Sequence, residues 1–446
     1  MIRIKKTPLM QYALLYLMLL IPGSCAVSRY LNATVLYGVV VMLYLLLMII
    51  NSGYRNIYIP IFVSLLAVAT IVIRAKTGGV GPLSFLENAA MLIIVYIAAA
   101  VDKKAFLLRY IRIVCVFAVI SIVFWSIFCI FPSLVSAWPA TSFWTQDLGT
   151  GQWATTLHGK GLWLYSYLEI HATRNCGFYT EPGVYQIVLN SVLFVLLFWR
   201  RELNIRSERE YWLYVVIIIT TLITCQSTTG YISMLVMLII FFISNSDKKA
   251  LRTVKWKLAF LVALVLAIVV IDFLLRGRSS LLYSQVLNKL FGGNVGGGLN
   301  LADSTGQYRM ITVMASLKAL SIDPYGIGFD AFYAIRDSFD PAAVAASIAT
   351  YAAVYGIIFW LAIIIMILYP VLKYEHRKLL IIAFCFMFVN STTSETYLFY
   401  PGLMVFPIYL SLHMKNFAFS HFRGSITRNI SERENFVAKT VRVSEV

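Results

Sequence analysis

A short polar stretch at positions 174–190 reads RNCGFYTEPGVYQIVLN and runs directly into apolar residues. Pro182 is favoured in the first turn of a helix, which predicts that a helix starts here with Glu181 or Thr180 at its N-cap. A helix N-terminus carries partial positive charge and free N–H groups, so it attracts anions. With the guanidinium of Arg174 added, the stretch predicts either an anion site beside a carboxylate base or a plain helix cap with a local salt bridge.

The same helix carries polar residues deeper in its apolar run. Gln186 and Asn190 are four residues apart, which places them on one helix face as an inward-facing polar stripe. We also expect the positive end of the helix to lower the pKa of Glu181. That effect would keep the carboxyl ionised but make it a weaker base.

A second polar region begins at the sequence GQYRMITVMASLKAL and continues to DPYGIGF. Its apolar spacing predicts a short amphipathic helix over 307–321, with Arg309 near the start. Gly326 and Gly328 allow a tight turn after that helix. A lone arginine on such a helix is either an interfacial residue or a functional one.

Three further residues are candidates for substrate contacts. Arg276 follows Asp272 by four residues, the favourable order for a helical ion pair, which leaves Arg278 as the arginine free for a ligand. Near the end of the chain, NSTTSETYLFYPG places Glu395 and Tyr397 in a turn rich in hydroxyl groups. Such a turn either binds sugar hydroxyls or is an ordinary solvated loop.

The elements that must position these residues are membrane helices. Of the 446 residues 60% are apolar and 13% are charged, with a mean hydropathy of +0.80, whereas a soluble domain carries roughly 25% charged residues. We therefore predict an all-α, polytopic membrane protein of about twelve helices. The expected spans are 9–27, 33–50, 57–73, 83–101, 110–131, 183–199, 211–225, 229–244, 257–275, 342–369, 379–390 and 397–414.

These spans form one predicted transmembrane helical domain over 1–414, interrupted by two long outer loops at about 132–181 and 276–341. The first loop is rich in Trp and Tyr, which suits the membrane interface. The remaining segment, 415–446, is polar and basic, and we expect it to be a disordered cytoplasmic tail.

The charge distribution predicts the orientation and excludes one class of partner. With the N-terminus in the cytoplasm, about 26 of the 37 Lys and Arg residues fall on the cytoplasmic side, as the positive-inside rule expects. The net charge of +17 is thus a consequence of topology and of attraction to anionic membrane lipids, and it does not indicate nucleic acid. The six cysteines are scattered, so neither a disulfide framework nor a zinc site is predicted.

Taken in order, RNCGFYTEPG before a helix, STTG, GQYRMITVMASLKAL…DPYGIGF and a last short outer turn resemble the O-antigen ligase/polymerase superfamily. The closer likeness is to the bacterial polymerases of O-antigen, capsule and exopolysaccharide repeat units. It covers about 174–401. The resemblance implies a multispanning glycosyltransferase of the bacterial inner membrane, acting at its outer face on undecaprenyl-diphosphate-linked oligosaccharide.

Individual residues match the motifs of this superfamily. Arg174, Gly177 and Glu181, followed by proline, match its Arg-x-x-Gly…Glu-Pro element. Arg309 and Gly328 match its Arg…Gly element in the second loop. The resemblance then implies that the two arginines stabilise a diphosphate leaving group and that Glu181 acts as the base. The residues assigned to substrate binding are Arg278, Gly177, Gly328, Glu395 and Tyr397.

The resemblance also sets the alternatives and the partners. The ligases carry a histidine before the span after the large loop, whereas this chain has FDPAAVAASIATY there, which favours a polymerase over a ligase. A lipid-linked oligosaccharide flippase is the alternative from another class, but it should place charges inside its spans. Besides the lipid-linked substrate and membrane lipids, a chain-length regulator and a flippase are the candidate partners. No cofactor is expected, and without an outer Asp-x-Asp pattern no metal is either.

Overall fold

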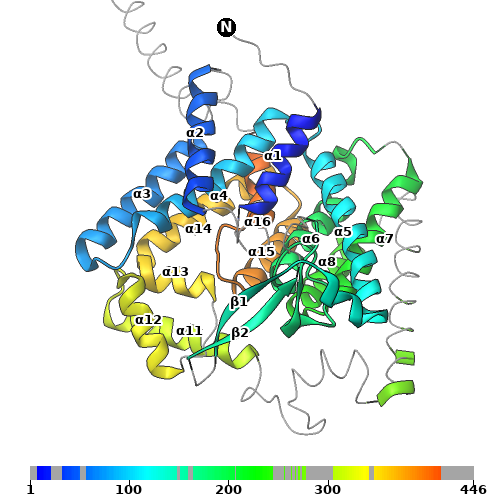
Figure 1. Ribbon diagram of the computed structural model, residues 1–446. Coiled ribbons are helices and arrows are strands. Elements are labelled where there is room, and N and C mark those ends of the chain that lie inside the picture. The colour runs from blue at the N-terminus through cyan, green and yellow to red at the C-terminus, as the bar shows by residue number, and fades with distance from the viewer. Residues whose placement is uncertain are drawn as a thin grey trace, which may run out of the picture.

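The structure is a computed structural model that describes residues 8–21, 33–50, 57–147, 151–158, 164–205, 207–244, 305–340 and 346–412, with a few positions between 256 and 277 (Figure 1). Most of the described chain is helical. The helices of the main bundle are α1 (Pro8–Leu20), α2 (Ala33–Ile50), α3 (Tyr58–Thr77), α4 (Pro82–Val101), α5 (Phe106–Ile130), α6 (Pro182–Phe198), α7 (Glu208–Cys225), α8 (Thr228–Ser244), α14 (Ile357–Tyr374), α15 (Lys378–Thr392) and α16 (Pro401–Ser411).

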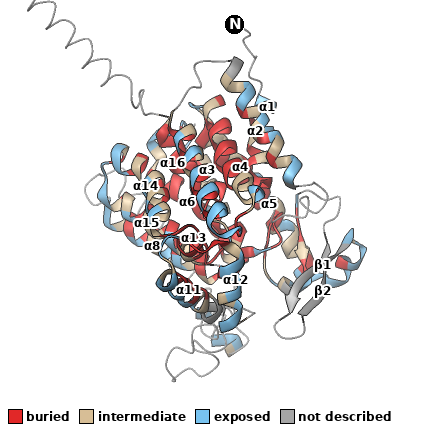
Figure 2. Ribbon diagram, turned by 90° about the vertical axis from the view of Figure 1, so that its left-hand side faces the viewer, coloured by how far each residue is buried: buried red, intermediate tan, exposed pale blue. Residues whose placement is uncertain are grey.

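The bundle has the surface of a membrane protein. Four of the described helices, α3, α4, α5 and α14, are long and apolar enough to cross a bilayer, and several shorter ones are equally apolar. Large apolar side chains such as Val116, Leu235 and Ile365 point outward, while the centre of the bundle is buried (Figure 2). The prediction of an all-α membrane protein agrees with these features. The count of twelve spans and the side of each terminus stay predictions, and the segments 257–275 and 415–446 fall largely or wholly outside the described residues.

Helix α6 is the central helix of the bundle. Every residue from Val184 to Phe198 is buried. Its two amides lie on one face as predicted: Asn190 Nδ2 donates to Gln186 Oε1 at 2.8 Å and to the carbonyl oxygen of Gly230 in α8 at 3.2 Å. These bonds satisfy Asn190 Nδ2 and Gln186 Oε1, whereas the buried Gln186 Nε2 and Asn190 Oδ1 have no hydrogen-bond partner among the described residues.

The predicted span 342–369 is instead two helices, α13 (Ser347–Tyr355) and α14, separated at Gly356. Gly356 has φ of +82°, and a β-carbon there would come within 2.4 Å of the carbonyl carbon of Tyr325. The chain around Tyr325 also bonds to the break, because Ile357 N–H donates to the carbonyl oxygen of Pro324 at 2.9 Å. The single-span prediction is therefore wrong, because tertiary contacts interrupt the apolar run.

Helix α11 (Thr305–Ile322) confirms a helix over the predicted range 307–321, but the helix does not separate an apolar face from a polar one. The buried residues are small and partly polar, and they follow helical spacing: Thr312, Ala315, Ser316 and Ala319. The bulky Met310, Met314 and Leu317 are exposed. Small residues allow α11 to approach α13 closely, and the outward apolar stripe suits a membrane interface.

The first long loop contains a small antiparallel sheet that was not predicted. It consists of β1 (Ala140–Asp147), β2 (Gly151–His158) and β3 (Tyr167–Leu168), in the order β1-β2-β3, with Ala140 paired to His158. An aromatic cluster packs beneath it, in which the ring of Trp138 meets those of Phe124 and Phe128 at 4.9 and 5.0 Å. Figures 1 and 2 show the hairpin, α11 and α12 (Gly328–Phe339) at the same end of the bundle.

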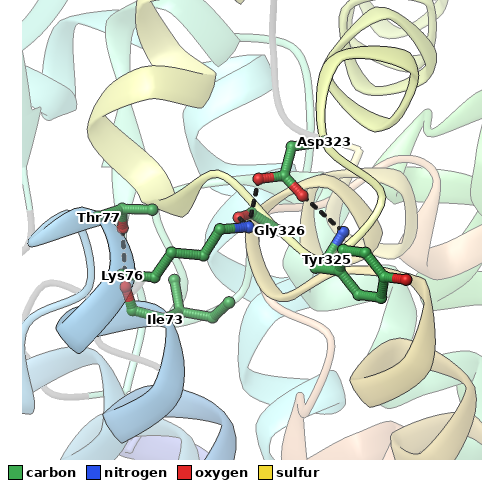
Figure 3. Close-up of polar contacts among 6 residues, drawn as sticks. All are labelled: Ile73, Lys76, Thr77, Asp323, Tyr325 and Gly326. Carbon is green, nitrogen blue, oxygen red and sulfur yellow. Dashed lines mark hydrogen bonds and ion pairs between the residues drawn. The ribbon is translucent and has the colours of Figure 1, made fainter.

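The turn between α11 and α12 is fastened to the end of α3 (Figure 3). Lys76 forms an ion pair with Asp323 and also donates to the carbonyl oxygen of Gly326 at 3.0 Å. Asp323 in turn accepts from the N–H of Tyr325 at 2.9 Å. These bonds hold the second long loop against the end of the bundle from which α4 starts.

Candidate functional site

The segment that carries Arg174 is tied to the end of α7. Asn175 N–H donates to the carbonyl oxygen of Thr224 at 2.9 Å, and the Asn175 side chain donates to Thr224 Oγ1 at 2.9 Å and to Ser121 Oγ at 3.1 Å. Arg174 Nε donates to the carbonyl oxygen of Cys225 at 3.4 Å. The buried Asn175 thus holds the backbone in place, and Arg174 is left half-buried beside it.

Gly177 makes the turn between Arg174 and α6. Its φ is +61°, and its N–H donates to Asn175 Oδ1 at 3.0 Å. A β-carbon at this position would come within 2.7 Å of the ring of Tyr185, so only glycine fits. Gly177 is buried, and the fold alone accounts for the residue type. It brings Arg174 and Glu181 to the same end of α6.

Glu181 is the N-cap residue of α6, and Pro182 follows at the first turn, as predicted. Its side chain, however, makes no capping hydrogen bond to the helix. The alternative of a cap with a local salt bridge is also not supported, because none of the ion pairs in the described chain joins Glu181 to Arg174. The carboxylate therefore remains available, and it is exposed to solvent.

Glu395 reaches the same helix end from the turn between α15 and α16. Glu395 is buried, with 6% of its surface exposed. Its backbone carbonyl oxygen accepts a hydrogen bond from the N–H of Ser347 at 3.0 Å. Its carboxyl lies against Gly183 in the first turn of α6. A carboxyl that the sequence places more than 200 residues after Glu181 is thus packed beside it.

Arg309 approaches from α11. Its Nη1 donates to Thr229 Oγ1 in α8 at 3.3 Å, and its buried Nε has no hydrogen-bond partner among the described residues. Thr229 is itself held by Asn390, whose Nδ2 donates to the Thr229 carbonyl oxygen at 2.9 Å and to Ser233 Oγ at 2.7 Å. An arginine with an unsatisfied N–H is ready to bind an anion.

These four residues, Arg174, Glu181, Arg309 and Glu395, form the charge cluster. Glu181 interacts electrostatically with both arginines, and Glu395 interacts with both arginines and with Glu181. The structure thus brings together the three residues predicted to be catalytic and one of those predicted to bind substrate. The members come from three separate segments of the chain, and the ion pairs of the described residues include none between two of them.

Burial dominates the electrostatics of the charge cluster. Desolvation raises the pKa of Glu181, although Arg174 and Arg309 act to lower it. The prediction of a lowered pKa for Glu181 is therefore wrong, because protein surrounds the carboxyl closely even though solvent still reaches it. Burial, followed by the charge of Glu181, raises the pKa of Glu395 from 4.5 to about 8. Glu395 is consequently protonated at neutral pH, and two guanidinium groups face a single carboxylate.

The other predicted site residues are Gly328, Tyr397 and Arg278. Gly328 starts α12 and packs on the turn between α3 and α4, where a β-carbon would come within 2.5 Å of Thr77 Oγ1. Tyr397 is near the charge cluster, since it interacts electrostatically with Glu181 and more strongly with Glu87 in α4. Arg278 lies outside the described residues.

Several residues that support the site were not singled out in the sequence. Asn175, Thr229 and Asn390 position the two arginines, and Gln226 at the end of α7 keeps a buried Oε1 without a partner among the described residues. Their common signal is polarity in a short turn or helix end between apolar runs. The signal is weak because such positions are polar in most membrane proteins.

Comparisons with known proteins add no assignment: no family model matches the chain, and no curated protein and no solved structure matches it either. The geometry of the charge cluster therefore carries the functional conclusion. Two guanidinium groups bind a phosphate or diphosphate bidentately. A solvent-reachable carboxylate with a raised pKa can take a proton from a hydroxyl group near neutral pH.

Proposed function

We propose that the chain is a membrane-embedded glycosyltransferase that joins undecaprenyl-diphosphate-linked oligosaccharide repeat units into a surface polysaccharide. The observation that carries this proposal is the charge cluster itself: Arg174, Arg309, Glu181 and Glu395 gathered at one end of an apolar helix bundle. A lipid-linked diphosphate needs cationic groups beside an apolar surface, and an acceptor hydroxyl needs a base.

The proposal includes the bacterial cytoplasmic membrane, about twelve spans, cytoplasmic termini and a site at the outer face. The described residues support this orientation. The end of the bundle opposite the charge cluster carries basic side chains, since Arg377 donates to the Phe198 carbonyl at the end of α6 and Arg112 pairs with Glu210 at the start of α7. Basic residues favour the cytoplasmic side.

The reaction proceeds by displacement at the anomeric carbon of the donor glycan. The acceptor hydroxyl oxygen forms the new C–O bond while its proton passes to the carboxylate of Glu181. The bond between the anomeric carbon and the diphosphate oxygen breaks, and undecaprenyl diphosphate leaves with the electron pair. Arg174 and Arg309 stabilise the negative charge that develops on the leaving group. Protonated Glu395 adds no negative charge that would oppose this.

The test is to replace Glu181 or Arg309 with alanine and to examine the surface glycan in cells that lack their own copy of the chain. We expect chain lengthening to be lost while the protein still inserts and single repeat units still reach the acceptor. Arg74→Ala is the control, because Arg74 is an exposed arginine in the last turn of α3 and lies outside the charge cluster, and it should lengthen chains normally. Normal chain length in both site variants would refute the assignment.

The same assay separates the alternatives. Loss of both the single repeat units and the long chains would indicate a flippase, because no unit would then reach the outer face. Long chains that accumulate on the lipid carrier without reaching the acceptor would indicate a ligase.

A further inference from the structure

A second carboxylate lies near the charge cluster and has no role in the reaction above. Glu87 is in the second turn of α4, a helix apolar enough to cross the membrane. Tyr37 in α2 donates its hydroxyl to Glu87 Oε1 at 2.7 Å. An ionisable residue in such a helix is costly to bury, so its presence marks a functional position more often than a structural one.

Two more tyrosines surround this carboxylate. Tyr397, from the turn between α15 and α16, and Tyr333, from α12, both interact electrostatically with Glu87 and with each other. Tyr397 also interacts with Glu181. Glu87, Tyr37, Tyr333 and Tyr397, the tyrosine cluster, thus come from four separate elements and adjoin the charge cluster through Tyr397.

The tyrosine cluster is open on one side. Tyr37 is 3% exposed, whereas Glu87 is half-buried and the ring of Tyr333 is 39% exposed. Phe329 stacks on Tyr333 with ring centroids 5.8 Å apart, which holds the exposed ring in place. An ionised carboxylate offers about four acceptor positions. Hydrogen bonds from Tyr37 and Tyr397 use two of these positions.

The hydrogen-bonded pair next to Glu87 is closed to solvent, unlike the tyrosine cluster. Asn88, the neighbour of Glu87 in α4, accepts a hydrogen bond from the hydroxyl of Tyr351 at 2.6 Å. Both of these residues are buried, so the pair is closed to solvent. Glu87, by contrast, is half-buried beside an exposed Tyr333.

We propose that the tyrosine cluster binds the hydroxyl groups of the acceptor glycan and presents one of them to Glu181. This inference rests on the proposed function, since polymerisation needs two glycans at once. The charge cluster binds the diphosphate of the donor and takes one proton from the acceptor, but it does not hold the acceptor glycan. A carboxylate accepts hydrogen bonds from sugar hydroxyls, tyrosine hydroxyls both donate and accept, and an exposed aromatic ring stacks on the apolar face of a sugar. The ligand class is a neutral or weakly charged oligosaccharide.

The experiment measures binding of the free oligosaccharide, released by mild acid from the polyprenyl-diphosphate-linked repeat unit of the source cell, to the full chain in lipid nanodiscs. We expect Glu87→Gln and Tyr333→Ala each to weaken binding by about tenfold, the effect of one charge-assisted hydrogen bond or one stacked ring. Tyr325→Ala is the matched control, because this 61% exposed tyrosine of the same loop faces Lys76 instead.

The outcomes separate this inference from the proposed function. Binding of unchanged strength in both variants, or no binding of the free oligosaccharide by the wild-type chain, would overturn the inference even if the chain polymerises. Binding that both variants weaken, in a chain that does not lengthen glycans, would uphold a glycan site and refute the polymerase. Tyr333→Ala alters an exposed ring, so it keeps the test valid if Glu87→Gln fails to fold.

Discussion

The carboxyl group of Glu395 lies directly against Gly183: a β-carbon built on Gly183 would stand 2.0 Å from Glu395 Oε1. Gly183 belongs to the first turn of α6, and Glu395 to the turn between α15 and α16. The absence of a side chain at position 183 therefore lets a protonatable group sit beside the positive end of α6, next to Glu181.

Gly183→Ala should displace Glu395 and disturb the charge cluster. Overpacking of this kind costs about 1–3 kcal/mol, and a displacement of about 1 Å in a site can lower the rate by up to about 100-fold. Thermal unfolding and chain lengthening in proteoliposomes are the measurements. Gly38→Ala, a helical glycine with nothing within 4 Å of the added carbon, is the control and should keep wild-type values. Equal behaviour of the two variants would contradict the close packing of Glu395.

Glu395 should make both stability and activity depend on pH. Its folded-state pKa of about 8 exceeds the ordinary 4.5, so its contribution to stability is complete below pH 4.5 and is lost as pH rises through about 8. The wild-type melting temperature should therefore fall between pH 6 and pH 9 more than that of Glu395→Gln. Activity should fall over the same range, because an ionised Glu395 offsets the arginines. Parallel curves for the two proteins would rule this out.

Arg309→Lys should lose activity although the positive charge is kept. Lysine lacks the planar fork that binds a diphosphate bidentately, and loss of one such donor lowers kcat by about 100- to 1000-fold. Steady-state rates with lipid-linked substrate are the measurement, and Arg74→Lys, in an exposed arginine of α3, is the control. A rate within twofold of the wild type would show that charge alone suffices.

Gly328→Ala should loosen α12 from the turn between α3 and α4. The added carbon would meet Thr77 Oγ1 at 2.5 Å and the Cα of Gly79 at 3.2 Å, and φ is +76°. Gly78→Ala separates the backbone strain of a positive φ from the steric clash, because Gly78 has φ of +71° but a β-carbon there would have nothing within 4 Å. We expect the backbone cost of about 1–2 kcal/mol in both variants and an additional loss in Gly328→Ala alone. The measurement is thermal unfolding together with proteolysis of α12.

Activity should not depend on a divalent metal. In the charge cluster the positive charge comes from Arg174 and Arg309, which need no ion beside them to stabilise a diphosphate. Assays after treatment with EDTA, followed by addition of Mg²⁺ or Mn²⁺, are the measurement. A loss of rate that only the metal restores would contradict this expectation.

The sequence by itself determined the all-α membrane class and where most of the described apolar helices start. Long apolar runs give a clear signal because the bilayer requires them, and local signals such as Pro182 mark a helix start. The helix over 307–321 also followed from local spacing. The hairpin of β1 and β2 was missed. Its two eight-residue strands contain Trp and Phe, and in sequence they resemble an aromatic loop at the membrane interface.

The tertiary structure alone decided the chemistry of the site. Sequence motifs identified Arg174, Glu181 and Arg309, but the pairing of Glu395 with Gly183 joins segments more than 200 residues apart. The pKa of Glu181 was predicted in the wrong direction for the same reason. A helix end is visible in local sequence, whereas desolvation depends on every segment packed around a group, and only the folded chain sets that packing.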